Sequence, residues 1–80
     1  MKNMEKYTQV FVEMFGKSAD EVKNLHYQDI IEWDSVGHMT LMSGLEDTFD
    51  IMLETDDIID FDSYEKGIEI LKKYNVDFES

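Results

Sequence analysis

The chain has 80 residues, a formal net charge of −12 and no cysteine. This length predicts a single small domain, 1–80, with a modest core and no room for a deep catalytic cavity, so we do not expect an enzyme. The lack of cysteine excludes disulfides, thiolate catalysis and cysteine-based metal sites. No stretch resembles a signal peptide or a membrane span, and we therefore expect a cytoplasmic protein that does not insert into membranes.

The negative charge is concentrated in the middle of the chain. No lysine lies between Lys23 and Lys66, and that interval holds twelve of the nineteen acidic residues, whereas the flanks hold seven acids and all seven lysines. A field of this kind repels nucleic acid and anionic membranes and attracts basic protein surfaces. We also expect the repulsion to weaken the fold and to favour weak divalent-cation sites between neighbouring carboxylates. The clusters concerned are Glu46, Asp47 and Asp50, and Glu54, Asp56 and Asp57.

Apolar residues three or four positions apart predict a first helix over 4–15, which ends at Gly16. Ser18 and Glu21 have the spacing of a capping box and predict one or two helical turns over 18–25. The connection 17–34 is long for a compact domain, and connections of this length are often functional.

A second long helix is predicted over 35–50, and a short one begins at Thr55. The last helix is capped by Asp62 or Ser63, and the tail from residue 75 is expected to fray apart from Val76. The fold class is therefore all-α, a bundle of three longer helices and one short third helix. The residues expected in the core of these later helices are Met39, Met42, Leu45, Ile58, Ile59, Ile68 and Leu71.

Two explanations of these apolar positions stay open. They pack as an ordinary core, or some of them part to admit an apolar guest, for which the flexible methionines are suited. Gly44 and Gly67 lie in predicted helix interiors, where glycine costs about 1 kcal/mol relative to alanine, so we expect neighbouring backbone or a ligand to come close there.

The stretch Asp34-Ser35-Val36 is the most informative part of the sequence. The helical pattern after it places Ser35 in a first turn, where helix-start amides and the macrodipole favour a negative group such as a phosphate ester. The alternative is an ordinary helix cap by either residue. A hydrolase triad of Ser35, His38 and Asp34 is not expected, because Asp34 is too close in sequence to reach the far nitrogen of His38. Two histidines are too few for a zinc site, and the acidic run after Asp56 fails the EF-hand pattern.

The segment 34–50, DSVGHMTLMSGLEDTFD, resembles the second helix of acyl carrier proteins, whose Asp-Ser-Leu motif carries 4′-phosphopantetheine on its serine. The resemblance is specific over about 32–71. It implies that Ser35 is the attachment site and that Asp34 is read with it by a magnesium-dependent phosphopantetheinyl transferase using coenzyme A. This sequence departs from the family where it has Val36, Gly37 and Thr40 in place of the common leucine, polar residue and glutamate.

The resemblance implies a monomeric carrier that holds acyl or aminoacyl groups as thioesters on this arm and presents them to acyl-transferring or synthase enzymes with basic docking patches. The surface expected to face these partners consists of Val36, Met39, Glu46, Asp47 and Asp50. Fatty-acid synthesis and a specialised biosynthetic pathway both stay open, as does sequestration of the cargo between the helices. The alternative function is an acidic helical adaptor that binds a basic partner without a prosthetic group.

The resemblance also assigns roles to the long connection and to His38. Ile30 and Ile31 are expected to anchor the connection in the core, and Trp33 is expected beside the attachment site. His38 is interpreted as a surface residue near the prosthetic group.

Overall fold

The structure, a computed structural model, describes residues 2–79, and five helices and no β-strand occur among them. The helices are α1 (Asn3–Phe15), α2 (Ala19–Val22), α3 (Ser35–Phe49), α4 (Thr55–Asp60) and α5 (Tyr64–Lys72). The predicted all-α fold is confirmed. The turns predicted over 18–25 form the single-turn helix α2, so a second short helix joins the expected bundle.

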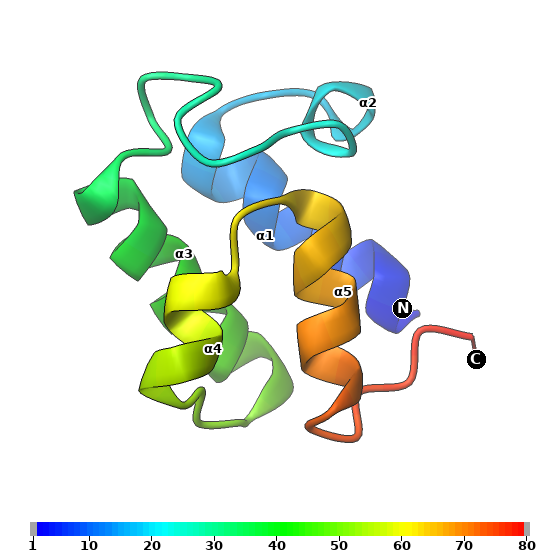
Figure 1. Cartoon of the computed structure of the whole chain (residues 1–80). Helices are drawn as coiled ribbons and strands as arrows, with labels where there is room; N and C mark the ends of the chain where they lie inside the picture. The colour runs from blue at the N-terminus through cyan, green and yellow to red at the C-terminus, as the bar shows by residue number, and fades with distance from the viewer. Residues whose placement is uncertain (1, 80) are drawn as a thin grey trace.

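The helices enclose one core, with the two ends of the chain on the same side of the molecule (Figure 1). α1 packs against α3, and α4 and α5 complete the enclosure. The side-chain amide of Asn3 donates to the carbonyl oxygen of Asp77 at 2.8 Å, which ties the start of α1 to the C-terminal tail. The tail does not simply fray after Val76, because the half-buried ring of Phe78 packs edge-on against Tyr7 at a centroid distance of 5.5 Å.

Local signals fix where the helices begin and end. Ser63 caps α5 by accepting the backbone N–H of Lys66 at 3.0 Å, so Ser63 and not Asp62 is the cap. Gly16 ends α1 in the left-handed region, at a φ of 65°, which glycine adopts without steric cost. Asp50 ends α3 in the same conformation, at a φ of 54°.

The glycines inside α3 and α5 are required by close packing. A Cβ atom on Gly67 would lie 2.1 Å from both the ring tip of Phe61 and the hydroxyl oxygen of Tyr7. A Cβ atom on Gly44 would lie 3.1 Å from a methyl group of Val10 on α1. A neighbour does come close at both glycines, but it is a side chain of the core and not the backbone or ligand that was expected.

Three residues predicted in the core are exposed. Ile31 is 90% exposed, Ile59 is 72% exposed and Met39 is 51% exposed, so these predictions are wrong. The short α4 turns only Asp57 and Ile58 inward, and Ile31 lies in the loop before α3, where helical periodicity places no constraint. Ile30 is partly buried against the core, as expected. Met42, Leu45 and Leu71 are fully buried, and Ile58 and Ile68 are partly buried.

The long connection is held in place by backbone hydrogen bonds to the segment between α4 and α5. The N–H of Tyr27 donates to the carbonyl oxygen of Asp62 at 2.8 Å, and the N–H of Tyr64 donates to that of Leu25 at 3.0 Å. These two bonds place His26 opposite Ser63 in an isolated antiparallel bridge. The connection before α3 is thereby tied to the start of α5. This anchoring supplies the structure that a connection of this length needs.

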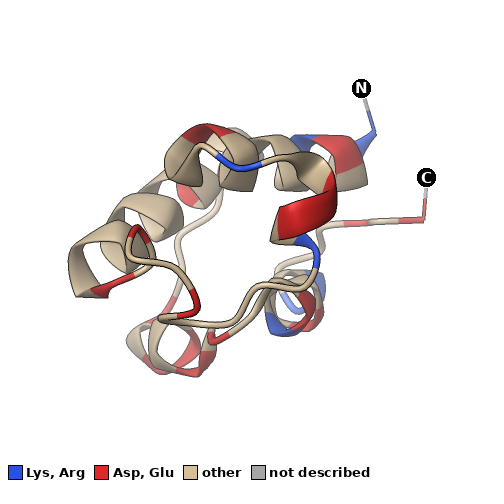
Figure 2. Ribbon diagram, turned by 90° about the horizontal axis from the view of Figure 1, so that it is seen from above, with Lys and Arg blue, Asp and Glu red and all other residues tan. Residues whose placement is uncertain are grey.

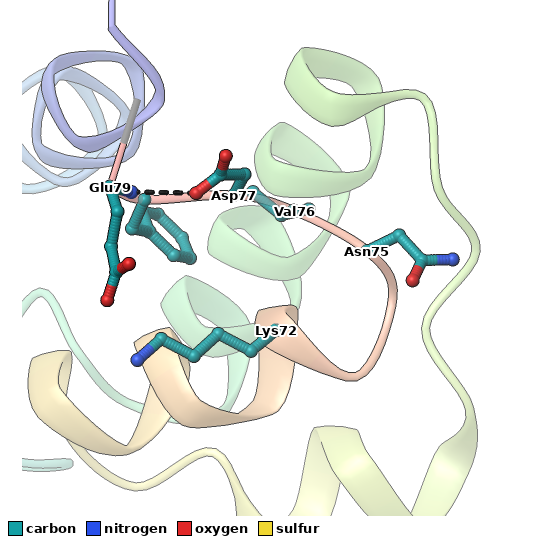
Figure 3. Close-up of a pocket in the computed structure, with 6 residues that line it drawn as sticks. Lys72, Asn75, Val76, Asp77 and Glu79 are labelled. Atoms are coloured by element: carbon teal, nitrogen blue, oxygen red, sulfur yellow. Dashed lines mark hydrogen bonds between the residues drawn. The ribbon is translucent and has the colours of Figure 1, made fainter.

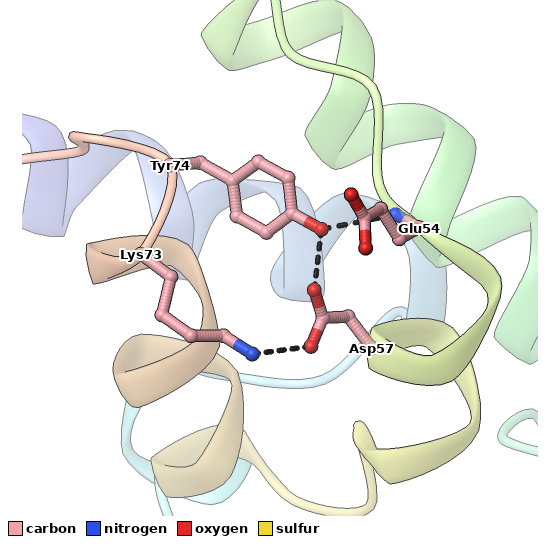
Figure 4. Close-up of polar contacts among 4 residues, drawn as sticks. All are labelled: Glu54, Asp57, Lys73 and Tyr74. Carbon is pink, nitrogen blue, oxygen red and sulfur yellow. Dashed lines mark hydrogen bonds and ion pairs between the residues drawn. The ribbon is translucent and has the colours of Figure 1, made fainter.

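A polar cluster joins α4 to the end of α5 (Figure 4). Lys73 and Tyr74 both donate hydrogen bonds to the buried carboxylate of Asp57, and the Tyr74 hydroxyl accepts the N–H of Glu54 at 2.9 Å. The bond from Lys73, followed by that from Tyr74, lowers the pKa of Asp57. One acid of the central interval is therefore neutralised by a lysine outside it. A looser pair, Lys17 and Glu32 at 3.9 Å, is a second exception to the predicted lack of compensating cations.

We predict that Asp57→Asn lowers the free energy of unfolding at pH 7 by about 1 kcal/mol, because the charge-assisted bonds are lost while Lys73 stays largely hydrated. Since the folded pKa of Asp57 lies below the unfolded value, its contribution is present above the unfolded pKa and disappears as pH falls through the folded one. Urea denaturation from pH 7 to pH 2.5 should show the two proteins converging below about pH 4.

The control is Asp56→Asn, which changes the exposed neighbouring carboxylate on the same helix. It should leave the stability at pH 7 within about 0.5 kcal/mol of the original chain. A stability difference for Asp57→Asn that stayed constant down to pH 2.5 would contradict the role given to the ionised carboxylate.

Candidate functional site

Ser35 is the first residue of α3 and is exposed to solvent. The side chain of Asp34 caps the helix, because its carboxylate accepts the backbone N–H of Gly37 at 2.8 Å. Of the two residues that could have capped the helix, Asp34 does so. The hydroxyl of Ser35 is therefore not needed to cap the start of the helix. It lies at the positive end of the macrodipole of a helix of 15 residues.

Gly37 allows the preceding loop to lie directly on the first turn of α3. A Cβ atom at this position would be 1.9 Å from the carbonyl oxygen of Glu32, which is backbone and cannot swing aside. The glycine that looks unfavourable for a helix by propensity is thus required by the contact between loop and helix. This contact fixes the path of residues 32–34 immediately before Ser35.

Trp33 and His38 occupy different places from those expected. Trp33 is fully buried, and its indole Nε1–H donates to Nδ1 of His38 at 2.9 Å. The His38 ring is half-buried and its Nε2 is 2.8 Å from the carbonyl oxygen of Ile58. Because Trp33 can only donate, Nδ1 is the acceptor, and Nε2 carries the proton that goes to Ile58.

The interpretation of His38 as a surface residue is therefore wrong, and Trp33 lies beneath the site instead of beside it. Sequence reasoning missed the pairing, although a buried indole N–H needs an acceptor and His38 is one of few nearby side chains that supply one. The same geometry leaves no hydrolase triad: both ring nitrogens of His38 are engaged by groups other than Ser35 and Asp34.

A groove of about 350 Å³ lies between α3 and α4 and begins at Ser35. α3 contributes Ser35, His38 and Met39 to its lining, and α4 contributes Ile58 and Ile59. The exposed Ile59 and Met39 thus both line this groove, which accounts for apolar side chains that the core does not use.

The remaining wall of the groove comes from the loop before α3 and from the segment that follows α4. They contribute the half-exposed Tyr27, the buried Phe61 and the exposed Asp62. The lining is mostly apolar, with polar groups at its margin, which is the usual composition of a small-molecule site.

The outer face of α3 combines apolar and acidic residues. Val36 is 74% exposed, and Asp47, three helical turns further along, is exposed on the same side. Asp50 is exposed at the end of the helix, whereas the half-buried Glu46 accepts the N–H of Leu53 at 2.8 Å. Figure 2 shows lysines on α1 and α5, whereas the charged residues of α3 and α4 are all acidic.

The acidic clusters do not assemble a metal site. Among residues 2–79 no group of three or more histidine, aspartate or glutamate side chains is placed to hold a metal ion. Glu46 and Asp57, one from each cluster, are instead hydrogen-bonded to Leu53 and to Lys73. The expected three-carboxylate clusters are therefore not assembled, because one member of each, Glu46 or Asp57, is used within the fold.

A second hollow of about 310 Å³ lies between the end of α5 and the C-terminal tail, and Lys72, Asp77 and Glu79 are among its lining residues (Figure 3). No residue of the Ser35 region lines it. The hydrogen bond from the N–H of Glu79 to the carboxylate of Asp77 joins two residues of the tail to each other. The groove beside Ser35 is thus the candidate site. None of the helices in the described part of the chain is both long and apolar enough to span a membrane.

Comparison with known proteins finds one related chain. The sequence is 39% identical over 57 residues to a protein of Streptococcus thermophilus named acyl carrier protein, a match that covers 71% of this chain and 77% of that protein. No family model matches the chain, and no solved structure matches it.

We predict that Gly37→Ala lowers the free energy of unfolding by about 1 to 3 kcal/mol, because the new methyl group collides with the Glu32 carbonyl. This exceeds the gain of up to about 1 kcal/mol that alanine brings through helix propensity. Urea denaturation measures the change. Ser43→Ala, at an exposed position of the same helix, serves as the control and should be neutral or slightly stabilising. A Gly37→Ala protein as stable as the original would refute the contact.

Proposed function

Because this chain belongs to the acyl carrier protein family, we propose that it holds acyl or aminoacyl groups as thioesters on a 4′-phosphopantetheine arm attached to Ser35, and presents them to partner enzymes. The chain is a carrier and not an enzyme. We further propose that it acts as a monomeric, cytoplasmic single domain over residues 1–80.

The observation that carries the attachment proposal is the position of Ser35. Its hydroxyl is exposed at the first turn of α3, while Asp34 performs the capping that a serine there would otherwise supply. The helix-start amides and the macrodipole favour a phosphodiester at this point, so the residues present fit the group. When attached, the arm supplies a distal thiol that carries the cargo, and the protein supplies position and recognition.

The proposed partners are a phosphopantetheinyl transferase and acyl-transferring or synthase enzymes with basic docking patches. Asp34 and Ser35 are proposed to be read together by the transferase. The partner-facing surface is proposed to consist of Val36, Met39, Glu46, Asp47 and Asp50, with the exposed apolar residues at its centre and the acids steering basic partners. Glu46 adds charge to this surface while its carboxylate also holds Leu53.

We predict that Ser35→Ala abolishes modification and leaves the fold intact. The helix keeps its cap on Asp34, so the free energy of unfolding should change by less than about 0.5 kcal/mol. Intact mass after incubation with coenzyme A, magnesium and a phosphopantetheinyl transferase measures loading. The original chain should gain one phosphopantetheinyl group, and the variant should gain none.

A matched variant, Asp34→Asn, should load more slowly without unfolding, because asparagine caps helices as well as aspartate does. Loading of the Ser35→Ala protein would show that the site is elsewhere. Failure of the original chain to load with an active transferase would favour the adaptor function instead.

We predict that Asp47→Lys slows loading by the transferase at low salt, and that the defect shrinks as ionic strength rises, because charges are screened over about 8 Å at physiological salt. Glu69→Lys makes the same change in net charge on the exposed side of α5 and should have a smaller effect. Glu46 is left unchanged because its reversal would also break the bond to Leu53. Equal rates for both variants at all salt concentrations would argue for an apolar interface around Val36.

A further inference from the structure

The floor of the groove beside Ser35 is made by its most buried lining residues, Phe61, His38 and Ile58. His38 is half-buried and Phe61 is 1% exposed, whereas Met39 and Ile59 at the margin are largely exposed. The ring of His38 approaches Phe61 edge-on at a centroid distance of 6.1 Å. The groove therefore deepens from exposed aliphatic side chains to a closed aromatic surface.

Hydrogen bonds hold this floor from two sides. Trp33 donates to Nδ1 of His38, and Nε2 of His38 donates to the carbonyl oxygen of Ile58, so both ring nitrogens are occupied. The His38 ring also lies nearly parallel to the indole, at an interplanar angle of 17°. Turning His38 out of the way would break both bonds and leave the fully buried indole N–H without a partner, which is costly.

The space behind the floor is filled by aromatic rings. Trp33 stacks on Phe15 at a centroid distance of 5.3 Å and meets Phe11 edge-on at 5.7 Å. Phe11 in turn stacks on Phe61 at 6.3 Å. A chain that entered the groove at Ser35 and moved past His38 would have to displace rings that are buried in the core.

The volume of the groove sets the size of its occupant. If a carbon-sized group takes about 30 Å³, the share of a water molecule in the liquid, a groove of about 350 Å³ holds roughly ten such groups. Some of this space is taken by the end of the arm, and one side is open to water. A group tethered to Ser35 is present at high effective concentration, so even a shallow apolar groove at the attachment point captures it.

We propose that His38, held by Trp33, is a specificity-determining residue that limits the depth of this groove, so that the carrier accepts a short acyl group and keeps a longer chain outside the helix bundle. This inference rests on the proposed attachment at Ser35 and adds to it the class of cargo. Met39 and Ile59 cover the sides of the acyl group, and His38 and Phe61 stop its end.

The test uses the full chain loaded at Ser35 with amide-linked acyl arms of increasing length, from acetyl through butanoyl, hexanoyl, octanoyl and decanoyl to dodecanoyl. Intact mass establishes loading, a thermal melt measures stabilisation, and the NMR signal of the Trp33 indole N–H reports on the floor. We expect the melting midpoint to rise by a few degrees per two-carbon step up to about octanoyl and then to stay level. The indole signal should keep its position throughout the series.

Two variants separate the floor from the margin. His38→Ala combined with Trp33→Phe removes His38 from the floor without leaving an orphaned indole N–H, and the rise should then continue to decanoyl or dodecanoyl. Met39→Ala changes the margin only, so the midpoint should level off at the same length as in the original chain. If the double variant does not fold, the length series of the original chain decides alone.

Full loading with a midpoint that keeps rising through dodecanoyl, or an indole signal that moves with the longer chains, would overturn the depth limit and leave the carrier function standing. Full loading with no change of midpoint at any length would show that the groove holds no cargo. Absence of any gain in mass would reject the attachment at Ser35 and this inference with it.

Discussion

The hydrogen bond from the buried indole of Trp33 to His38 is the interaction on which the rest of this structure depends. It joins the loop before α3 to the second turn of that helix, and the same imidazole holds α4 through the carbonyl oxygen of Ile58. A buried indole N–H without an acceptor is costly, so the loop, α3 and α4 are constrained together. Gly37 makes this arrangement sterically possible, because only a glycine lets the backbone of Glu32 lie against the first turn. The exposed position of Ser35 follows from these two contacts.

The contacts that hold α4 against the rest of the bundle are largely polar. Only Asp57 and Ile58 of this helix turn inward, so little apolar area holds it against the bundle. Hydrogen bonds take that role: His38 holds the end of α4, Glu46 holds Leu53 before its start, and Asp57 reaches the end of α5. A segment held by a few directional contacts keeps a defined position and still leaves apolar side chains free to line a groove.

The high negative charge is compatible with a folded chain because some of the acidic side chains form hydrogen bonds within the fold and others stay in solvent. Asp57 and Glu46 serve inside the fold, whereas Asp47 and Asp50 stay at the surface near the exposed Val36. The surface of α3 thus combines exposed acids with an apolar side chain, and transient protein interfaces are built from charge for long-range attraction and apolar groups for close contact. For a carrier that must meet several enzymes in turn, fast association and modest affinity are the relevant properties.

The sequence by itself determined the helical class, the approximate bounds of the helices and the position of Ser35 at a helix start, because periodicity, caps and glycine stops act within a few residues. It also indicated close packing at Gly44 and Gly67, since a glycine inside a helix needs a compensating contact. Only the tertiary structure decided that Trp33 lies beneath the site, that His38 bridges to Ile58, and that Met39 and Ile59 face a groove. Each depends on which segments meet across the bundle. Helical spacing reports the side of a helix on which a residue lies, but it does not report which neighbour, or how much water, that side will face.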